Sequence, residues 1–380
     1  MKKKWTVNLA GFFESVLTKL EKKTGKNLSQ ARQDFICKYM TGMLQSRSVQ
    51  DKEIASHMDT NVKIASDVRR IERFYEGYST DFELFSLLLS QCLPTGKVKL
   101  CMDRTDWKFG NAWHNLLVIT VRIGGTGIPI WVEVLDKGQG TSNTKERINI
   151  VNKVIELIGK DRIHSFMADR EFIGEKWINF LDDNNIDFYI RLRNNQYFEW
   201  CGEKDQINKK LGGSKKQLIE GVPMYGGTYS LAIVKGSDGK EVAVLTNTSA
   251  KRALKAYKKR WSIEVFFQSL KSRGVRLETT QRKEPQRIRT LFILSSLAYV
   301  LCFIFGFYRH VKEKRIPVKN HGYKANSFAR VGLDFIREAI KLGTNLDSVF
   351  KTFLKEMTER WKVFKEYSDF DVQMRKSTVG

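Results

Sequence analysis

The order of strand-like and helix-like segments between residues 97 and 193 is the strongest constraint on the fold of this chain. Three β-rich runs come first, separated by Gly and Asn, and the chain then alternates helix, strand, helix and strand. Strands in direct succession favour antiparallel pairing, and strands separated by helices favour parallel pairing. The order therefore predicts an α/β fold with a mixed sheet and helices on its faces, with strands at 97–103, 115–123, 128–135, 163–168 and 187–193, and helices at 145–159 and 174–184.

The segments on either side of this region have different patterns. Residues 1–95 carry apolar side chains at helical spacing, residues 195–247 are Gly-rich with short β-like runs, and residues 311–380 are again helical in pattern. A helix is expected to begin after Ser249, which can cap it, and to continue to about Arg273 before Gly274. We therefore expect four parts: a helical region at 1–95, a core formed by 96–194 and 248–310, a β insertion at 195–247, and a helical region at 311–380.

The net charge of the chain points to a polyanionic partner. Lys and Arg number 66 against 42 Asp and Glu, which gives +24, and residues 251–289 alone carry 13 basic and 3 acidic side chains. Nucleic acid is the first candidate and an anionic membrane surface the second, while a solvated basic face is the simpler alternative. Residues 46–78 predict short helices that bring Arg69, Arg70 and Arg73 together. They form either a helix-turn-helix that reads DNA or a small bundle with a charged outer face.

Other features limit where the protein works. The five cysteines are scattered and never in C-x-x-C spacing, so we expect free thiols in a reducing cytoplasm. The basic N-terminus leads into no apolar stretch with a cleavage site, which argues against secretion. Residues 290–308 are uncharged and long enough to span a membrane, but polar residues in their first half and basic flanks on both sides favour a buried core helix.

Two aspartates follow predicted strands of the sheet. Asp103 ends the first strand, in CMDRTDW, and Asp169 follows the fourth, in FMADREFIG. Neighbouring strands would bring both carboxylates to one edge, where a bound cation offsets their repulsion and hard oxygen ligands suit magnesium. Either aspartate alone is more commonly a turn residue or a helix cap.

The helix after Ser249 carries a line of polar residues on an otherwise apolar element. Tyr257, Arg260, Glu264 and Lys271 lie at relative positions 0, 3, 7 and 14, which places them on one narrow stripe. An intrahelical salt-bridge ladder would have the same residue types. Exposed ladders seldom occur on so apolar a helix, so the stripe favours a functional site over a salt-bridge ladder.

These residues carry a resemblance to a known family. The spacing Y-x-x-R-x-x-x-E-x-x-x-x-x-x-K resembles the signature of the insertion-sequence-four family of DDE transposases, and the two aspartate motifs are similar to that family's, in the same order. The resemblance covers about residues 97–275. It implies an RNase H-like core with a β insertion before the glutamate helix, and helical N- and C-terminal regions.

The resemblance also implies residue roles. Asp103, Asp169 and Glu264 would be the catalytic, metal-binding triad for two Mg²⁺ ions, with Mn²⁺ able to substitute, and Tyr257, Arg260 and Lys271 would contact DNA. Matching to the family gives the nearby Asp106 no catalytic role. Relatives often use a DNA hairpin and stack a flipped base on an aromatic side chain. Trp200 lies near the insertion, but nothing in the sequence assigns it that role.

The leading hypothesis is therefore an insertion-sequence transposase in the bacterial cytoplasm, associated with the nucleoid. It would cleave and join double-stranded DNA at terminal inverted repeats and insert it into target DNA, as a homodimer in the DNA complex. Residues 1–95 would bind DNA and 311–380 are the candidate dimerisation region. The alternatives are a catalytically inactive or domesticated transposase that only binds DNA, and a basic membrane-associated protein anchored by residues 290–308.

Overall fold

The computed structural model describes residues 28–77, 96–135, 140–211, 214–236, 239–320 and 324–342, together with positions 25, 85–86, 89–90, 93–94 and 138. The chain divides into two compact units. The sheet unit comprises Gly96–Asp106 and Asn115–Val265. The helical unit comprises the described residues of Met1–Thr95, Trp107–His114 and Phe266–Gly380.

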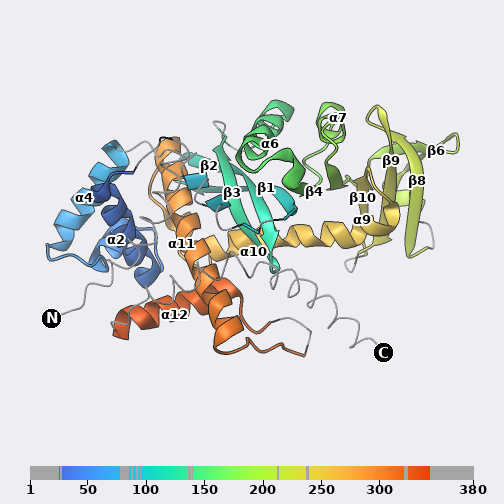
Figure 1. The fold of residues 1–380 in the computed structure, drawn as a ribbon. Helices are drawn as coiled ribbons and strands as arrows, with labels where there is room; N and C mark the ends of the chain where they lie inside the picture. The colour runs from blue at the N-terminus through green and yellow to red at the C-terminus, as the bar shows by residue number, and fades with distance from the viewer. Residues whose placement is uncertain are drawn as a thin grey trace. The chain divides into compact units, whose positions relative to one another are not determined.

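The sheet unit is built on one eight-stranded sheet (Figure 1), in the order β3-β2-β1-β4-β5-β10-β9-β8. Its strands are β1 (Val98–Phe109), β2 (Ala112–Ile123), β3 (Thr126–Val134), β4 (Ile163–Ala168), β5 (Asp187–Arg191), β8 (Lys216–Met224), β9 (Gly227–Lys235) and β10 (Glu241–Thr246). β1 and β2 are joined by a two-residue turn, and β2 pairs antiparallel with β3. β4 then pairs in parallel with both β1 and β5. The mixed α/β sheet predicted from the order of segments is confirmed, and its first five strands have the RNase H-like arrangement.

Helices lie on both faces of this sheet (Figure 1). On one face lie α6 (Thr144–Ile158) and α7 (Glu175–Asp183). A capping box marks the start of α6. The Asn143 side chain accepts a hydrogen bond from the Glu146 backbone amide, and the Glu146 side chain accepts one from the Asn143 backbone amide. The other face is covered by α9 (Ala250–Tyr257), the short 3-10 helix η2 (Lys258–Arg260) and the start of α10 (Trp261–Leu270). The strand β2 is buried over eight consecutive residues, as expected for a strand covered on both faces.

The β-rich region 195–247 mostly extends the main sheet. β6 (Tyr197–Trp200) and β7 (Glu203–Gln206) form a separate two-stranded sheet, followed by α8 (Ile207–Lys210). β10 pairs antiparallel with β5, and β9 and β8 follow it outward. The insertion therefore continues the sheet at its β5 edge, because the backbone groups on that edge of β5 find their partners in β10.

The helical unit contains α2 (Gln30–Ser46), α3 (Asp51–Ser56), α4 (Ile64–Gly77), α11 (Pro285–Lys312) and α12 (Phe328–Leu342), with the 3-10 helix η3 (Leu277–Thr279). The short helices expected within 46–78 are α3 and α4, and α4 carries the three arginines. The residues predicted to dimerise, 311–380, lie largely outside the described residues from position 343 onward.

The apolar stretch at 290–308 lies within α11. Among the residues that the structure describes, α11 is the one helix long and apolar enough to cross a membrane, and all of its most apolar window is buried in the protein. It packs closely on α12 at two glycines, where Gly306 faces the Phe328 backbone and Gly332 faces the Cys302 backbone. These packing partners place α11 in the helical unit, whereas the predicted domain bounds grouped it with the sheet.

Candidate active site

The register of two parallel strands brings the predicted aspartates to one edge of the sheet. β1 pairs with β4 so that Met102 lies beside Ala168. Asp103 is the next residue of β1, and Asp169 is the first residue after β4. Since parallel neighbours advance together, their successors emerge side by side. The Asp169 carboxylate is close enough to raise the pKa of Asp103.

The glutamate of the predicted triad, Glu264, lies on the helical segment formed by α9, η2 and α10, which covers one face of the sheet. Ser249 caps α9 as expected, since its hydroxyl accepts a hydrogen bond from the Lys251 amide. The single helix predicted up to Arg273 is interrupted, however, because Lys258–Arg260 adopt the tighter 3-10 form and α10 ends at Leu270. Glu264 lies in the first turn of α10.

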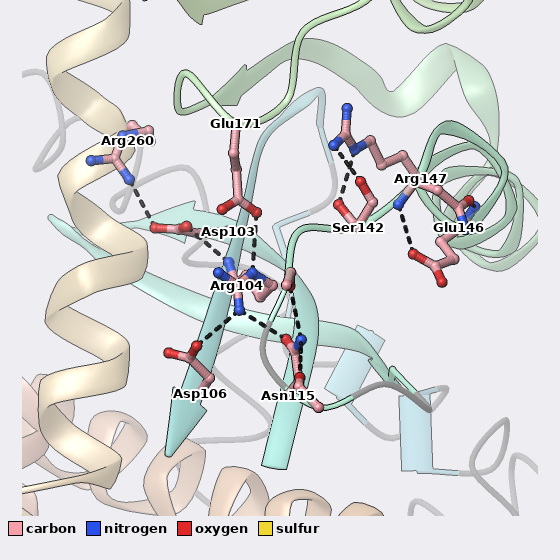
Figure 2. Close-up of polar contacts among 12 residues, drawn as sticks. Asp103, Arg104, Asp106, Asn115, Ser142, Glu146, Arg147, Glu171 and Arg260 are labelled. Carbon is pink, nitrogen blue, oxygen red and sulfur yellow. Dashed lines mark hydrogen bonds and ion pairs between the residues drawn. The ribbon is translucent and has the colours of Figure 1, made fainter. Parts of the chain in front are cut away.

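Arg260 connects the residues of the predicted site. Its Nη1 donates to Asp103 Oδ2 over 2.9 Å, and its Nη2 donates to Glu264 Oε1. Its Nε donates to the Tyr257 hydroxyl at 3.2 Å, and that hydroxyl donates to Asp169 Oδ1 at 3.1 Å. Figure 2 shows Arg260 reaching from the helix towards Asp103 on β1. One guanidinium thus joins all three carboxylates, two directly and Asp169 through Tyr257.

Burial and charge act against each other in this cluster. Burial raises the pKa of Asp103 to about 6, the Arg260 guanidinium and the Arg104 amide oppose that rise, and Asp169 and Glu171 add to it. Burial likewise raises the pKa of Tyr257 to about 12. For Arg260, burial disfavours the charged form, but Tyr257 and the carboxylates outweigh it and the pKa rises. The site is therefore a concentration of negative charge that one cation holds together.

The donor atoms suit a hard divalent cation, although the described residues do not form a ready ligand shell. No group of three His, Cys, Asp or Glu side chains among the described residues lies close enough together to hold a metal ion. The three carboxylates instead surround Arg260, whose positive charge stands where a cation would neutralise them. Carboxylate oxygens of this kind match hard divalent cations such as Mg²⁺ and Mn²⁺.

Lys271, the fourth residue of the predicted stripe, belongs to the helical unit. Its Nζ lies 2.6 Å from Glu278 Oε1 and 6.0 Å from the centre of the Trp107 ring. Its proposed contact with DNA beside the other three residues stays a prediction.

A second polar network, which the sequence did not reveal, lies next to Asp103 (Figure 2). Arg104 Nη1 donates to Asp106 Oδ2 at 3.0 Å and to Asn115 Oδ1 at 3.1 Å, and its Nε lies 3.4 Å from Glu171 Oε1. Asn115 in turn donates to the carbonyl oxygens of Gly138 and Gly140. The network ties β1, β2, the segment after β3 and the segment after β4 together around Asp103. The Asp106 carboxylate is thus a partner of Arg104, and its having no catalytic role stays a prediction.

Two tryptophans of the sheet unit are exposed. Trp261, directly after Arg260, is 57% exposed. Trp200 on β6 is exposed as well, and Lys210 Nζ lies 5.3 Å from the centre of its ring. Trp261 directly follows Arg260, the arginine of the stripe, and this position is the sequence signal that could have drawn attention to it.

Comparison with known proteins gives this geometry a family. The family model described as transposase DDE domain matches residues 94–301, which is more than half of the chain. No curated protein sequence is significantly similar to the chain. Among eleven similar chains of solved structures is a piggyBac transposase, determined by cryo-electron microscopy as a synaptic complex with hairpin DNA. It has 12% sequence identity and a TM-score of 0.45, over 94% of this chain and 82% of that chain. The matched residues contain Asp103, Asp169 and Glu264, and the chain belongs to the family of proteins with a transposase DDE domain.

Proposed function

We propose that this protein is the transposase of a bacterial insertion sequence of the insertion-sequence-four group, which cleaves DNA at terminal inverted repeats and transfers the freed strand to target DNA. A transposase acts on DNA, so the family itself supports DNA as the partner. The observation that carries the finer proposal is the convergence of Asp103, Glu264 and, through Tyr257, Asp169 on Arg260.

Asp103, Asp169 and Glu264 would hold two divalent cations. When bound, such ions activate water or a 3′-hydroxyl on one side of the scissile phosphate and stabilise the leaving oxygen on the other. The carboxylates supply the negative charge that retains the ions, and their placement on β1, after β4 and on α10 fixes them on separate rigid elements.

The cationic and phenolic side chains would orient the substrate. The planar guanidinium of Arg260 can bind two phosphate oxygens at once. These bonds would take the place of its bonds to the carboxylates when a metal binds there. Tyr257 keeps its proton near neutral pH, because burial raises its pKa to about 12, and so remains a hydrogen-bond donor to Asp169 or to a phosphate. Lys271 would add a third contact near the cut end, and a homodimer would hold two such ends.

The test is cleavage of a duplex that carries the end of the protein's own element. Purified wild-type protein with Mg²⁺ is expected to cut at the element boundary, whereas Asp103→Asn and Glu264→Gln should bind the duplex and leave it intact. Glu156→Gln on the exposed side of α6 is the matched control, since its surface ion pair with Lys153 contributes little. Asp106→Asn should retain cleavage at a reduced rate, because it serves Arg104. Binding without cleavage by wild type in Mg²⁺ and in Mn²⁺ would favour the inactive DNA-binding alternative.

A further inference from the structure

A group of lysines on the sheet unit lies outside the residues assigned above. Lys259 is half-buried in η2, and its backbone carbonyl oxygen lies 3.9 Å from Cys101 Sγ, two residues from Lys99 on the same face of β1. Lys255 lies four residues earlier on α9, and Arg122 lies on β2. Burial first, and then repulsion from these neighbours, lowers the pKa of Lys259 to about 8. A folded protein that crowds cations in this way gains stability from any anion that lies between them.

A histidine on the neighbouring strand shows how far the group extends. The pKa of His164, an exposed residue on β4, is lowered by the partial burial of its ring and by the charges of Lys99, Lys97 and Lys259. The Asp187 carboxylate opposes this shift. We call Lys97, Lys99, Lys255 and Lys259 the lysine cluster. Within the ranges that the structure describes, no ion pair joins a member of the lysine cluster to a carboxylate. Its positive charge is therefore not neutralised within these ranges.

The lysine cluster is separate from the carboxylate site. Lys99 and Asp103 lie on the same face of β1 but four residues apart, which is about 13 Å along a strand. Lys259 and Arg260 are consecutive in a 3-10 helix, where successive residues point about 120° apart, so their side chains face different directions. Arg260 bonds Asp103, whereas Lys99 is the charged neighbour that lowers the pKa of Lys259 most. A phosphate held by the lysine cluster is thus not the one that is cut.

The arrangement of the cations matches a nucleic-acid backbone better than a compact ligand. Lys255 and Lys259 are four residues apart, a spacing at which like charges destabilise a helix unless an anion bridges them. Lys97 and Lys255 are exposed, and each precedes a half-buried lysine of the cluster, by two residues before Lys99 and by four before Lys259. Duplex DNA offers a phosphate charge about every 1.7 Å of its axis and releases counterions when such cations bind it.

We propose that the lysine cluster binds the phosphate backbone of duplex DNA at a stretch separate from the one held at the carboxylates. This inference rests on the proposed function for its partner, DNA, but not on cleavage. The contacts would be independent of base sequence, because lysine ammonium groups that meet phosphates do not read bases. They would increase the hold on DNA beyond the cut end, on the face of the sheet that α9 covers.

The test is the salt dependence of DNA binding by the full chain, measured by fluorescence anisotropy in EDTA so that no cleavage occurs. The probe is a labelled duplex that carries the element's end, alongside a duplex of unrelated sequence. The double variant Lys255→Gln, Lys259→Gln is expected to lower the slope of log Kobs against log[salt] by about 1.8 on both duplexes, since each phosphate contact contributes about 0.9.

The matched control is Lys145→Gln, Lys176→Gln, which removes the same charge from exposed positions on α6 and α7, on the other face of the sheet. Its slope should equal that of wild type, and the variant Lys255→Arg, Lys259→Arg should retain the wild-type slope. Thermal denaturation of every variant separates loss of binding from loss of folding.

Three results would overturn the proposal. The first is an unchanged slope, with an unchanged Tm, for the Lys255→Gln, Lys259→Gln variant. The second is an equal loss of slope in this variant and in the Lys145→Gln, Lys176→Gln control. The third is that the Lys255→Gln, Lys259→Gln variant loses binding to polyglutamate but keeps its binding to DNA. The last result would assign the cluster to an acidic protein surface. A protein that shows the predicted slopes but never cuts DNA would contradict the proposed function alone, and a protein that cuts DNA with unchanged slopes would contradict this inference alone.

Discussion

Arg260 Nη1 lies 2.9 Å from Asp103 Oδ2, and the two side chains are only 12% and 19% exposed. They are 157 residues apart in the chain and belong to a 3-10 helix and a strand of the same unit. The same guanidinium also bonds Glu264. This pair therefore keeps the candidate site assembled when carboxylates alone would repel one another.

Replacement of Arg260 by Ala should destabilise the metal-free protein. The change leaves buried carboxylates without their cation, and such a loss costs about 1–3 kcal/mol in free energy of unfolding. Thermal denaturation in EDTA should show a lower Tm than wild type, and Mn²⁺ should raise the Tm of the variant more than that of wild type, because Arg260 no longer competes for the carboxylates. Arg193→Ala, at an exposed position, is the control. An equal response to Mn²⁺ in wild type and variant would contradict this account.

Arg104 is expected to act as a positioning residue. It bonds Asp106, Asn115 and Glu171 around the neighbouring Asp103. Arg104→Met should lower the rate of cleavage by about 10- to 100-fold, since small displacements of reacting groups have effects of that size. DNA affinity measured in EDTA should stay close to that of wild type, and Lys160→Met on the exposed turn before β4 should change neither quantity. Loss of affinity that matches the loss of rate would assign Arg104 to DNA binding instead.

The contact between α11 and α12 should tolerate no side chain larger than hydrogen at Gly306. A Cβ there would lie 1.7 Å from the Phe328 carbonyl oxygen, so Gly306→Ala must push the helices apart. We expect a loss of about 1–3 kcal/mol in stability, measured by chemical denaturation. Gly77→Ala on α4 is the matched control, because nothing lies within 4 Å of its added Cβ. It should leave stability unchanged or raise it by up to about 1 kcal/mol, and equal stabilities for the two variants would refute the close contact.

The stability of the sheet unit should rise between about pH 8 and the ordinary lysine range. Burial, followed by repulsion from Lys99, Arg122 and Lys255, lowers the pKa of Lys259 to about 8, and His164 faces the same group from β4. Across this window the unfolded chain binds a proton that the folded protein does not, so the free energy of unfolding increases with pH. Below pH 8 both states are protonated and the repulsion acts in full. Denaturation across pH 7.5 to about 10 should show a smaller rise for Lys259→Gln than for wild type, and identical curves would disprove the assignment.

Much of the sheet could be predicted from the sequence, since continuous apolar runs and Gly or Asn turns mark its first five strands. The register could not be predicted, because the pairing of Met102 with Ala168 depends on long-range packing that no local pattern records. The joining of β10 to β5 was missed for the same reason. A run of β-like segments predicts strands but does not identify which edge they extend.

The site was predictable as residue types and spacing but not as contacts. Tyr257 and Arg260 do contact the aspartates, and Glu264 joins them through Arg260, yet the helical stripe that suggested these residues assumes one regular helix. The 3-10 turn at Lys258–Arg260 rotates each residue by about 120° and shifts everything after it. Trp261, the first residue after this turn, is exposed. The network around Arg104 left no signal, since arginine, aspartate and asparagine at those positions are common on strands.

The most direct test of the central claim is a crystal structure of the protein with its DNA end and Mn²⁺, recorded at a wavelength where manganese scatters anomalously. The account predicts anomalous peaks coordinated by Asp103, Asp169 and Glu264, with Arg260 moved from the carboxylates to a phosphate. Peaks at other residues, or none at these carboxylates in a complex that cleaves its DNA, would contradict it.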